Sequence, residues 1–327
     1  FMKKYLITLR LQTVKKVRGF FDGREYLEVQ PPRLLGLPGQ EPYLDPLWTT
    51  VHRPDGWTGE MALITSPEYT LKKMLGAGFD KVYDLGPCFR DNEPWDGSHD
   101  IEFLMLEWYR KNASLSDLMD ETEALVRFVI QDEYVTKPFR RLTVEEALRD
   151  YAKIELSELL GNDEAMKTKA KDLGQTVHDT DTWDDLFHKI FLSHVEHRLG
   201  WNEEKTEYQP TFLYRYPASQ AALAKSDPSD ERYALRVELY IGDLELCNGF
   251  EELSNPDEQR ARFEEEIALR KTLGKKTWAI DEDLLQALPA LGTCSGNAFG
   301  IDRLVMLRAR TSSIGDIMPL PIQKRLH

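Results

Sequence analysis

The sequence lacks the features of a disulfide-rich or membrane-embedded protein. Its 327 residues include only three cysteines, Cys88, Cys247 and Cys294, which are too few and too scattered for a disulfide framework or a zinc site. No apolar run approaches the roughly 18–20 residues of a membrane-spanning helix, and we expect no signal peptide. The sequence therefore predicts a cytoplasmic location. We exclude Phe1, which precedes Met2, from the fold predictions.

Positive charge is also scarce relative to negative charge. The chain has 42 lysines and arginines against 56 aspartates and glutamates, a formal net charge of −14. Binding nucleic acid over a broad surface needs clustered basic residues that neutralise phosphates. The composition therefore argues against extensive nucleic-acid binding. Hydrophobic residues make up 41% and charged residues 30% of the chain, a balance typical of a globular protein with a sizeable core.

Internal repeats and low-complexity segments are absent, and no regular crossover helices separate the predicted strands. Periodicity and turn residues predict helices at 5–22 and 69–75 and strands at 81–91, 102–110, 211–217 and 236–250. Residues from about 138 to 208 are predicted to be mostly helical and charged, and we interpret them as an insertion. Because the strands occur as adjacent pairs, we predict an α+β fold with an antiparallel or mixed sheet and helices around it.

The segment 236–250 has the pattern of a tight β-hairpin. Gly242-Asp243 separates two alternating runs, as a two-residue turn does. The pairs expected on a largely apolar face are Ile241 with Leu244, Leu239 with Leu246 and Val237 with Asn248. Glu238 and Glu245 then lie diagonally across the opposite face, roughly 7–8 Å apart at the backbone.

Two carboxylates that converge on an apolar hairpin need a cation or a shared proton. A Mg²⁺ ion held by Glu238, Glu245 and substrate phosphates fits this requirement. The alternative interpretation is a solvated face with two unrelated glutamates. A glycoside hydrolase site also uses paired acids. It is a more distant alternative, because little else in the sequence resembles a sugar cleft.

Two further segments contain residues suited to a nucleotide. Arg90 stands at a strand end and Phe103 in the return strand, so the arginine can clamp an α-phosphate and the ring can stack on a purine. Alternation places on one face the side chains of Phe103, Met105, Glu107 and Tyr109. The glycine-rich run Gly296–Arg303 leads into a helix, which suits a triphosphate, although its spacing matches no dinucleotide fingerprint and no P-loop occurs. The alternatives are a surface arginine beside a buried strand and a glycine turn for close packing.

Together these segments resemble the three signature motifs of class II aminoacyl-tRNA synthetases, in order and across nearly the whole chain. Motif 1 is similar to the N-terminal helix with Glu28–Pro32, motif 2 to the run from Phe89 to Phe103, and motif 3 to Gly300–Arg303. The segments that resemble the lysyl-tRNA synthetases more narrowly are 65–68, 102–109, 217–220 and 245–250. They are most similar to the short paralogues of those enzymes, the elongation factor P lysyl ligases.

The resemblance implies a single catalytic domain over residues 2–327, with an antiparallel sheet flanked by helices, a homodimer interface at motif 1 and the helical insertion at about 138–208. It implies no anticodon-binding domain, since we expect the chain to begin at motif 1. The implied reaction uses ATP and Mg²⁺ to activate lysine or (R)-β-lysine as an aminoacyl-adenylate, and transfers the acyl group to a lysine side chain of elongation factor P. Ala298 stands where lysyl-tRNA synthetases usually have glycine, which favours a β-amino acid.

The motif matches also imply roles for individual residues. Arg90 holds the α-phosphate, Phe103 stacks on adenine and Arg303 contacts the γ-phosphate. Glu238 and Glu245 bind Mg²⁺, and Glu245 joins the two arginines in the catalytic set. Further ATP contacts are implied for Asn92, Glu93, His99, Asp100, Leu246 and Gly300. Contacts to the amino-acid substrate are implied for Ser66, Pro67, Glu68, Tyr109, Asn248, Glu252 and Ala298, with Glu252 on the ε-ammonium group.

Two departures from the paralogues affect the nucleotide site. Arg-Asp-Asn-Glu at 90–93 is one residue longer than the usual Arg-Asn-Glu, so either Asn92 or Glu93 contacts adenine. His-Asp-Ile-Glu-Phe at 99–103 replaces the usual His-Asn-Pro-Glu-Phe. Two other functions are considered. One is a freestanding lysyl-tRNA synthetase-like enzyme that charges tRNA or another amine. The other is a non-catalytic sensor of an amino acid or adenylate, which usually accompanies loss of the ATP-binding residues that this sequence retains.

Overall fold

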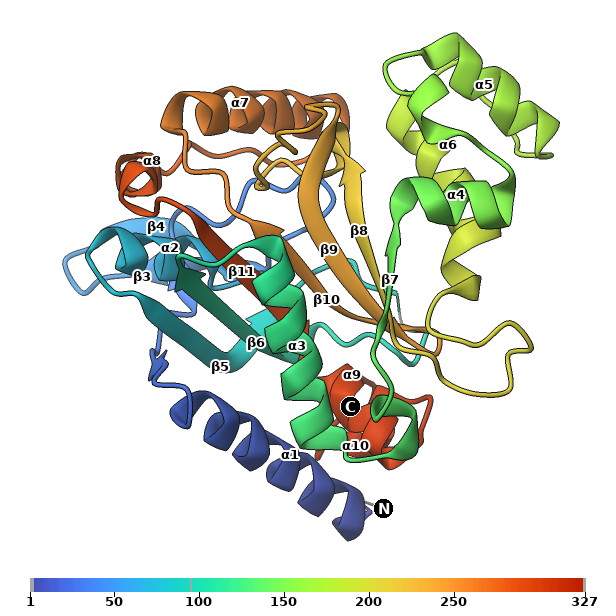
Figure 1. The fold of residues 1–327 in the computed structure, drawn as a ribbon. Helices are drawn as coiled ribbons and strands as arrows, with labels where there is room; N and C mark the ends of the chain where they lie inside the picture. Colours follow the sequence, from blue (N-terminus) through green and yellow to red (C-terminus); the bar gives the residue numbers. More distant parts are fainter. Residues whose placement is uncertain (1–2, 95, 326–327) are drawn as a thin grey trace. The chain divides into compact units, whose positions relative to one another are not determined.

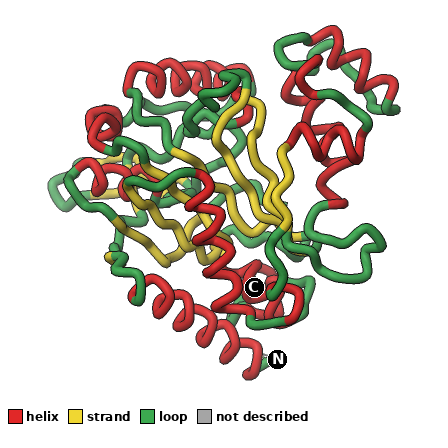
Figure 2. Tube along the Cα trace, in the orientation of Figure 1, coloured by secondary structure: helices red, strands yellow, loops and turns green. Residues whose placement is uncertain are grey.

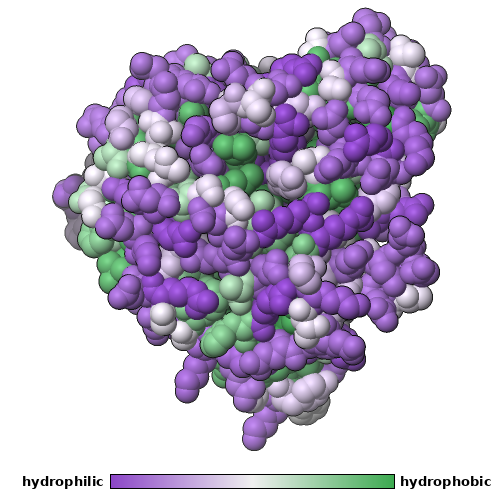
Figure 3. All heavy atoms as spheres, in the orientation of Figure 1, coloured by the Kyte–Doolittle hydropathy of each residue, from purple (hydrophilic) through white to green (hydrophobic). Residues whose placement is uncertain are grey.

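The computed structural model describes residues 3–94 and 96–325 (Figure 1). The chain divides into two compact units, Phe1–Ser114 with Leu253–His327, and Leu115–Glu252. Each unit combines strands with helices (Figure 2). None of the described helices is long and apolar enough to cross a membrane. Figure 3 shows a mostly hydrophilic surface on the face that it draws, with apolar side chains gathered in small patches.

The first unit is built on four strands in the order β1-β5-β6-β11. They are β1 (Leu27–Glu28), β5 (Lys81–Phe89), β6 (Glu102–Lys111) and β11 (Cys294–Gly300). β1 pairs parallel with β5, whereas β5 with β6 and β6 with β11 are antiparallel. A three-stranded antiparallel sheet, which the sequence analysis did not predict, contains β2 (Leu34–Leu35), β4 (Thr58–Leu63) and β3 (Trp48–His52).

The first unit also contains seven α-helices among its described residues, and α1 packs on the strands through buried aromatic side chains. The helices are α1 (Lys4–Asp22), α2 (Glu68–Gly76), α7 (Pro256–Thr272), α8 (Glu282–Ala287), α9 (Ile301–Ala309), α10 (Ile314–Ile317) and α11 (Ile322–Arg325). The ring of Phe21 on α1 stacks 4.8 Å from that of Tyr83 on β5 and lies 5.4 Å from that of Trp108 on β6. All three side chains are fully buried, so this cluster fixes the predicted N-terminal helix against the strands.

The second unit contains the strands β7 (Arg140–Thr143), β8 (Thr211–Pro217), β9 (Tyr233–Ile241) and β10 (Leu244–Glu251). They lie in the order β10-β9-β8-β7, with β7 and β8 parallel and the other pairs antiparallel. Its α-helices are α3 (Leu115–Ile130), α4 (Val144–Ala152), α5 (Asp163–Asp172) and α6 (Trp183–Ile190). A capping box between Thr143 and Glu146 opens α4. The region predicted to be helical packs against β8 and β9 through an apolar cluster that includes Leu148, Phe187 and Leu213.

The predicted hairpin register is right at the turn and wrong beyond Glu245. Gly242 takes a left-handed φ of 61° at the turn, and Leu244 and Glu245 pair with Ile241 and Tyr240 as expected. The register then shifts by one residue, because a bulge at Leu246 leaves that residue without a partner in the ladder. Cys247, rather than Leu246, pairs with Leu239, and Asn248 pairs with Glu238 instead of Val237.

The bulge changes which face Asn248 occupies. Side chains alternate along a strand, so one extra residue moves every later side chain to the opposite face. Asn248 therefore shares the face of Glu238 and Glu245. The α+β prediction is confirmed by both units, and the parallel pairs β1–β5 and β7–β8 make the strand pairing mixed rather than purely antiparallel.

Candidate active site

Strands β6 and β11 bring residues from the predicted motifs 2 and 3 onto one face of the first unit. In their antiparallel ladder, Ala298 lies across from Glu107, Gly296 across from Tyr109 and Gly300 across from Met105. Residues directly opposite each other point to the same face of a sheet. β11 therefore contributes only small side chains, those of Gly296, Ala298 and Gly300, beside these β6 residues.

Arg90 directly follows β5 and lies over the ring of Phe103 on β6. Its guanidinium carbon is 4.9 Å from the ring centroid, and its backbone N–H donates to the carbonyl of Ile101 over 3.0 Å. Arg90 Nε is buried and has no hydrogen-bond partner among the described residues. A buried donor without an acceptor costs free energy until a ligand supplies one. The arginine is therefore suited to an anionic oxygen of a bound phosphate.

Arg303 lies in the first turn of α9, which begins directly after Gly300. Its guanidinium group is 3.0 Å from His99 Nε2, and His99 Nδ1 is 3.0 Å from the carboxylate of Asp96. The arginine can only donate, so Nε2 accepts and Nδ1 carries the proton toward Asp96. Burial opposes ionisation of Asp96, but hydrogen bonds from His99 and Ser98 lower its pKa to about 2. This chain of contacts orients Arg303 without neutralising it directly.

The other predicted nucleotide contacts differ in their surroundings. Asn92 is exposed, with a left-handed φ of 60°, and Glu93 is partly exposed. Asp100 is buried, and its carboxylate accepts hydrogen bonds from Arg325 over 2.5 Å and from the backbone N–H of Ile322 over 3.1 Å. Asp100 thus anchors α11 to the segment before β6. An ATP contact from any of these three residues stays a prediction.

Glu107 is the centre of a hydrogen-bonded group at the predicted amino-acid site. Ser66 Oγ and the Tyr109 hydroxyl each donate to its carboxylate over 2.7 Å. Burial, together with the nearby charge of Glu68, raises the pKa of Glu107 to about 8. Ser66 Oγ also accepts the backbone N–H of Glu68 over 3.0 Å, one residue after Pro67, the N-cap of α2. Glu107 was predicted to lie on this face, but no role was predicted for it.

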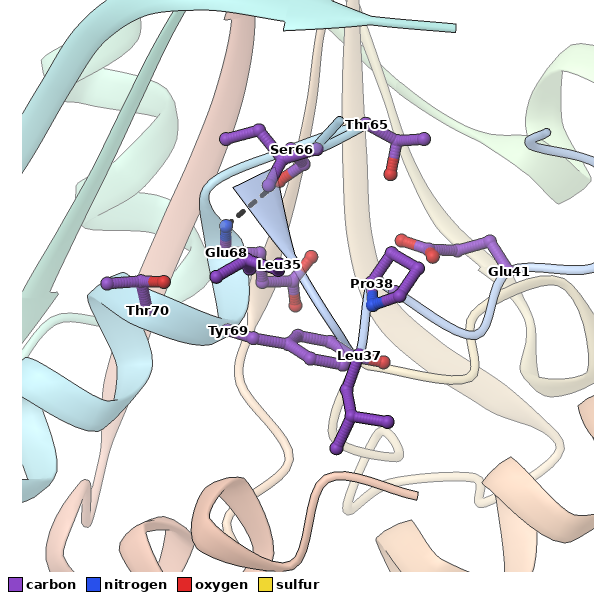
Figure 4. Close-up of a pocket in the computed structure, with 11 residues that line it drawn as sticks. Leu35, Leu37, Pro38, Glu41, Thr65, Ser66, Glu68, Tyr69 and Thr70 are labelled. Carbon is purple, nitrogen blue, oxygen red and sulfur yellow. Dashed lines mark hydrogen bonds between the residues drawn. The ribbon is translucent and has the colours of Figure 1, made fainter. Parts of the chain in front are cut away.

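A small pocket lies between the loop around residues 35–41 and the start of α2 (Figure 4). Its lining includes Glu41, Ser66, Glu68 and Tyr69. Figure 4 shows the side chain of Glu41 reaching into this region from the loop, opposite the α2 residues. Glu68 forms a buried ion pair with Lys72 over 2.5 Å, so the two charges largely offset each other. Glu41 was not predicted, because nothing in the sequence of a glycine- and proline-rich loop indicates where a side chain points.

In the second unit, Arg236 on β9 joins two of the predicted site residues. Its Nε donates to Asn248 Oδ1 over 2.9 Å, and its Nη2 donates to Glu238 Oε1 over 2.5 Å. The other oxygen of Glu238 accepts hydrogen bonds from the hydroxyls of Tyr216 and Tyr240. This hydrogen-bond network depends on the bulge at Leu246, because the bulge places Asn248 opposite Glu238. A sequence without an alignment gives no signal for a bulge, which is why Arg236 was missed.

The carboxylates of Glu238 and Glu245 in the second unit are compatible with a Mg²⁺ site at which substrate phosphates supply further ligands. Glu238 is buried and accepts three hydrogen bonds, whereas a carboxylate offers about four lone-pair sites, so one position is left for a metal. Glu245 is partly exposed on the same face. No group of three or more histidine, cysteine, aspartate or glutamate side chains in the described parts of the chain is arranged to hold a metal alone. Glu252, the residue expected to bind the substrate ammonium group, is buried, with 1% of its surface exposed.

Comparison with known proteins agrees with these observations. Residues 2–324 match the family of tRNA synthetases class II (D, K and N). Proteins named elongation factor P–(R)-β-lysine ligase are similar over almost the whole length. The one from Proteus mirabilis is 35% identical over 319 residues, and the one from Photobacterium profundum is 36% identical over 322 residues. In both cases the match covers 96% of this chain and 94% of the relative. The relative from Pectobacterium atrosepticum is 36% identical with the same coverage.

The chain therefore belongs to the class II tRNA synthetase family and, within it, to the family of the elongation factor P–(R)-β-lysine ligases. This confirms the family resemblance drawn from the sequence and the prediction of an ATP-dependent ligase with a class II fold. The assignments of individual site residues stay predictions.

Proposed function

We propose that this protein activates lysine or (R)-β-lysine with ATP and transfers the aminoacyl group to a lysine side chain of elongation factor P. The observation that carries the proposal is the similarity to elongation factor P–(R)-β-lysine ligases at 35–36% identity over 96% of the chain. Support also comes from the first unit, where a buried arginine donor lies over an aromatic ring, as a nucleotide site requires.

The proposed reaction has two steps. A carboxylate oxygen of the amino acid attacks the α-phosphorus of ATP, and the bond to the bridging oxygen breaks to release pyrophosphate. The neutral ε-amine of the acceptor lysine then attacks the carbonyl carbon of the adenylate, AMP leaves and the amine loses a proton. Neither step needs a protein nucleophile. Catalysis therefore consists of orientation and of stabilising the charge that develops on the phosphate.

The nucleotide is held by residues of both signature motifs. Arg90 donates to the α-phosphate with its unpartnered Nε, and Phe103 provides a ring face for adenine. Arg303 contacts the γ-phosphate in the orientation that His99 gives it. The remaining contacts proposed for ATP are Asn92 or Glu93, Asp100, Leu246 and Gly300.

Glu245 and Glu238 are the proposed Mg²⁺ ligands, and Glu245 is the more exposed of the two. When bound, the metal would reduce the charge repulsion between the phosphates and an incoming carboxylate. Arg236 keeps Glu238 and Asn248 in place beside Glu245. The carboxylate and amide are thereby oriented before a ligand arrives, which lowers the cost of binding.

The amino acid is recognised at both ends in this proposal. Glu252 is the proposed partner of the ε-ammonium group, and Tyr109 and Asn248 are further proposed contacts of the amino acid. Ser66, Pro67 and Glu68 contact the end with the amino and carboxylate groups. The methyl group of Ala298, across from Glu107, restricts the space at the α-carbon and thereby favours a substrate whose amino group is on the β-carbon.

The two compact units and the helical region at about 138–208 are proposed to be one catalytic domain with an insertion. The match of a single family over residues 2–324 supports this organisation. A homodimer through motif 1 is also proposed. It rests on the resemblance of the N-terminal helix and residues 28–32 to motif 1.

An acceptor competition tests the proposal. The protein is incubated with ATP, Mg²⁺ and labelled (R)-β-lysine or α-lysine, together with elongation factor P and total tRNA from the same organism. We expect label on elongation factor P and none on tRNA, with more transfer from (R)-β-lysine. Label on tRNA alone would favour the freestanding lysyl-tRNA synthetase-like enzyme. Label on neither acceptor, with pyrophosphate still released, would reject the acceptor but not the activation step.

A further inference from the structure

The pocket of Figure 4 contains a carboxylate that none of the proposed contacts uses. Glu41 Oε2 is completely buried and has no hydrogen-bond partner among the described residues. Glu68, on the opposite side, already has Lys72 as a partner at 2.5 Å. A buried carboxylate oxygen that lacks a hydrogen-bond donor is costly. Its presence at the end of a pocket therefore indicates a ligand that supplies both a positive charge and N–H donors.

The position of Glu41 is built into the fold. The buried side chain of Arg270 on α7 donates to the carbonyls of Glu41 (2.8 Å) and Leu44 (3.0 Å). The backbone N–H of Gln40 donates to the Tyr69 hydroxyl on α2 over 3.2 Å. The loop is therefore tied both to α7 and to α2. A ligand group that enters the pocket meets a carboxylate held in advance, which makes binding more favourable.

The pocket's size restricts the ligand. Its volume is about 10 Å³, which is roughly the room for one group of the size of water. A primary ammonium group has this size, a positive charge and three N–H donors. A divalent metal fits less well, because no group of three metal-binding side chains occurs in the described regions. Ser66, which lines the same pocket, also donates to Glu107, so the pocket is continuous with the site proposed for the amino acid.

We propose that Glu41 binds the amino group nearest the carboxylate of the substrate, so that the pocket selects diamino acids over ω-amino acids. This inference rests on the proposed function, in which a lysine-type amino acid is the substrate. Glu41 holds the near amino group together with Glu68 of the same unit. Glu41 is then a specificity-determining residue in addition to those that the family motifs contain.

The protonation of Glu41 offers an independent readout. Burial and the charge of Glu68 raise the pKa of Glu41. Its own backbone N–H, Arg90 and Lys72 act in the opposite direction, and Tyr69 and Glu266 also face it. An arriving ammonium group favours the ionised carboxylate, so binding of the diamino acid should lower the pKa of Glu41, and proton release measured over a range of pH reports this change. An ω-amino acid without the near amino group should release less.

The test compares wild-type protein, Glu41→Gln and the control Glu265→Gln, which changes an exposed carboxylate on α7. Amino-acid-dependent exchange of pyrophosphate into ATP is measured with (R)-β-lysine, α-lysine and 6-aminohexanoate, which lacks the near amino group. We expect Glu41→Gln to raise KM for both diamino acids about 10- to 100-fold, as loss of a charged hydrogen bond does. KM for 6-aminohexanoate should stay within about twofold of the wild type, and Glu265→Gln should change none of the three.

Equal changes for all three substrates, or no change, would overturn the assignment, because a merely structural glutamate cannot distinguish them. Titration calorimetry with lysine in two buffers of different ionisation enthalpy gives the second readout, with fewer protons released by Glu41→Gln than by the wild type. If the wild type exchanges pyrophosphate with none of these amino acids, the proposed function fails. In that case the calorimetry alone tests the role of Glu41. Equal affinity for lysine and equal proton release in the wild type and in Glu41→Gln would reject that role.

Discussion

Ala298 on β11 lies directly across from Glu107 on β6 in an antiparallel ladder. Their side chains therefore point to the same face, with a methyl group beside a carboxyl group that also accepts hydrogen bonds from Ser66 and Tyr109. A single added methyl group in a binding site typically changes discrimination by about 10- to 200-fold. This pair gives the proposed preference for (R)-β-lysine a specific location in the fold.

Replacing Ala298 by glycine should widen the site at the α-carbon. We expect Ala298→Gly to raise kcat/KM for α-lysine relative to (R)-β-lysine by about tenfold or more. Pyrophosphate exchange with the two amino acids measures the ratio. Ala290→Gly, at an exposed position, is the control and should leave the ratio unchanged. If Ala298→Gly leaves this ratio unchanged, the methyl group of Ala298 does not determine the preference between the two amino acids.

Phe103 should contribute mainly to binding of the nucleotide. Stacking of a base on an aromatic ring is worth about 1–3 kcal/mol, so Phe103→Leu should raise KM for ATP about 5- to 100-fold at saturating amino acid. Phe79→Leu serves as the matched control, because Phe79 is an exposed phenylalanine of the same unit. An unchanged KM for ATP in Phe103→Leu would show that adenine binds elsewhere.

Arg236 should be important for both stability and substrate binding. Arg236→Met leaves the buried carboxylate of Glu238 with only the two tyrosine hydroxyls. Removing one partner of a buried pair costs about 3–5 kcal/mol, which urea denaturation measures. Arg236→Lys retains the charge but cannot bridge Asn248 and Glu238 in the same way, so we expect it to fold and to raise KM for the amino acid. Equal stability of wild type and Arg236→Met would contradict this role.

Stability should fall as the pH rises from about 5 to 8. Burial and the nearby Glu41 raise the pKa of Glu266 from 4.5 to about 8. In this window the folded state keeps a proton that the unfolded state releases, so a rise in pH favours unfolding. The Glu266→Gln variant has no titrating group at this position. Its free energy of unfolding should therefore fall less between pH 5 and 8 than that of the wild type, by on the order of a few kcal/mol. Denaturation of Glu266→Gln and Glu265→Gln at several pH values checks this, and parallel curves would contradict it.

The sequence predicted those parts of the fold that depend on local patterns. The N-terminal helix and the Gly242 turn were predicted because each depends on residues a few positions apart. The family motifs located Arg90 and Phe103, whose contact the structure contains. These features require only short stretches of chain.

The parts that sequence reasoning missed depend on packing between distant segments. The bulge at Leu246 interrupts an otherwise regular alternation, and only the folded hairpin puts Asn248 beside Arg236. Glu41 is in a loop whose path is set by Arg270, 229 residues away along the chain. Residues of the same type in a loop or on a strand can be exposed or buried, and tertiary contacts decide between these outcomes.

The central claim is transfer of an amino acid to elongation factor P, and intact mass spectrometry tests it most directly. Unmodified elongation factor P from the same organism is incubated with this protein, ATP, Mg²⁺ and (R)-β-lysine, and again with the Arg90→Met variant. We expect the mass of elongation factor P to increase by one lysyl residue. This increase should depend on ATP and be lost with the Arg90→Met variant. An unchanged mass of elongation factor P, under conditions in which the protein consumes ATP with the amino acid, would contradict it.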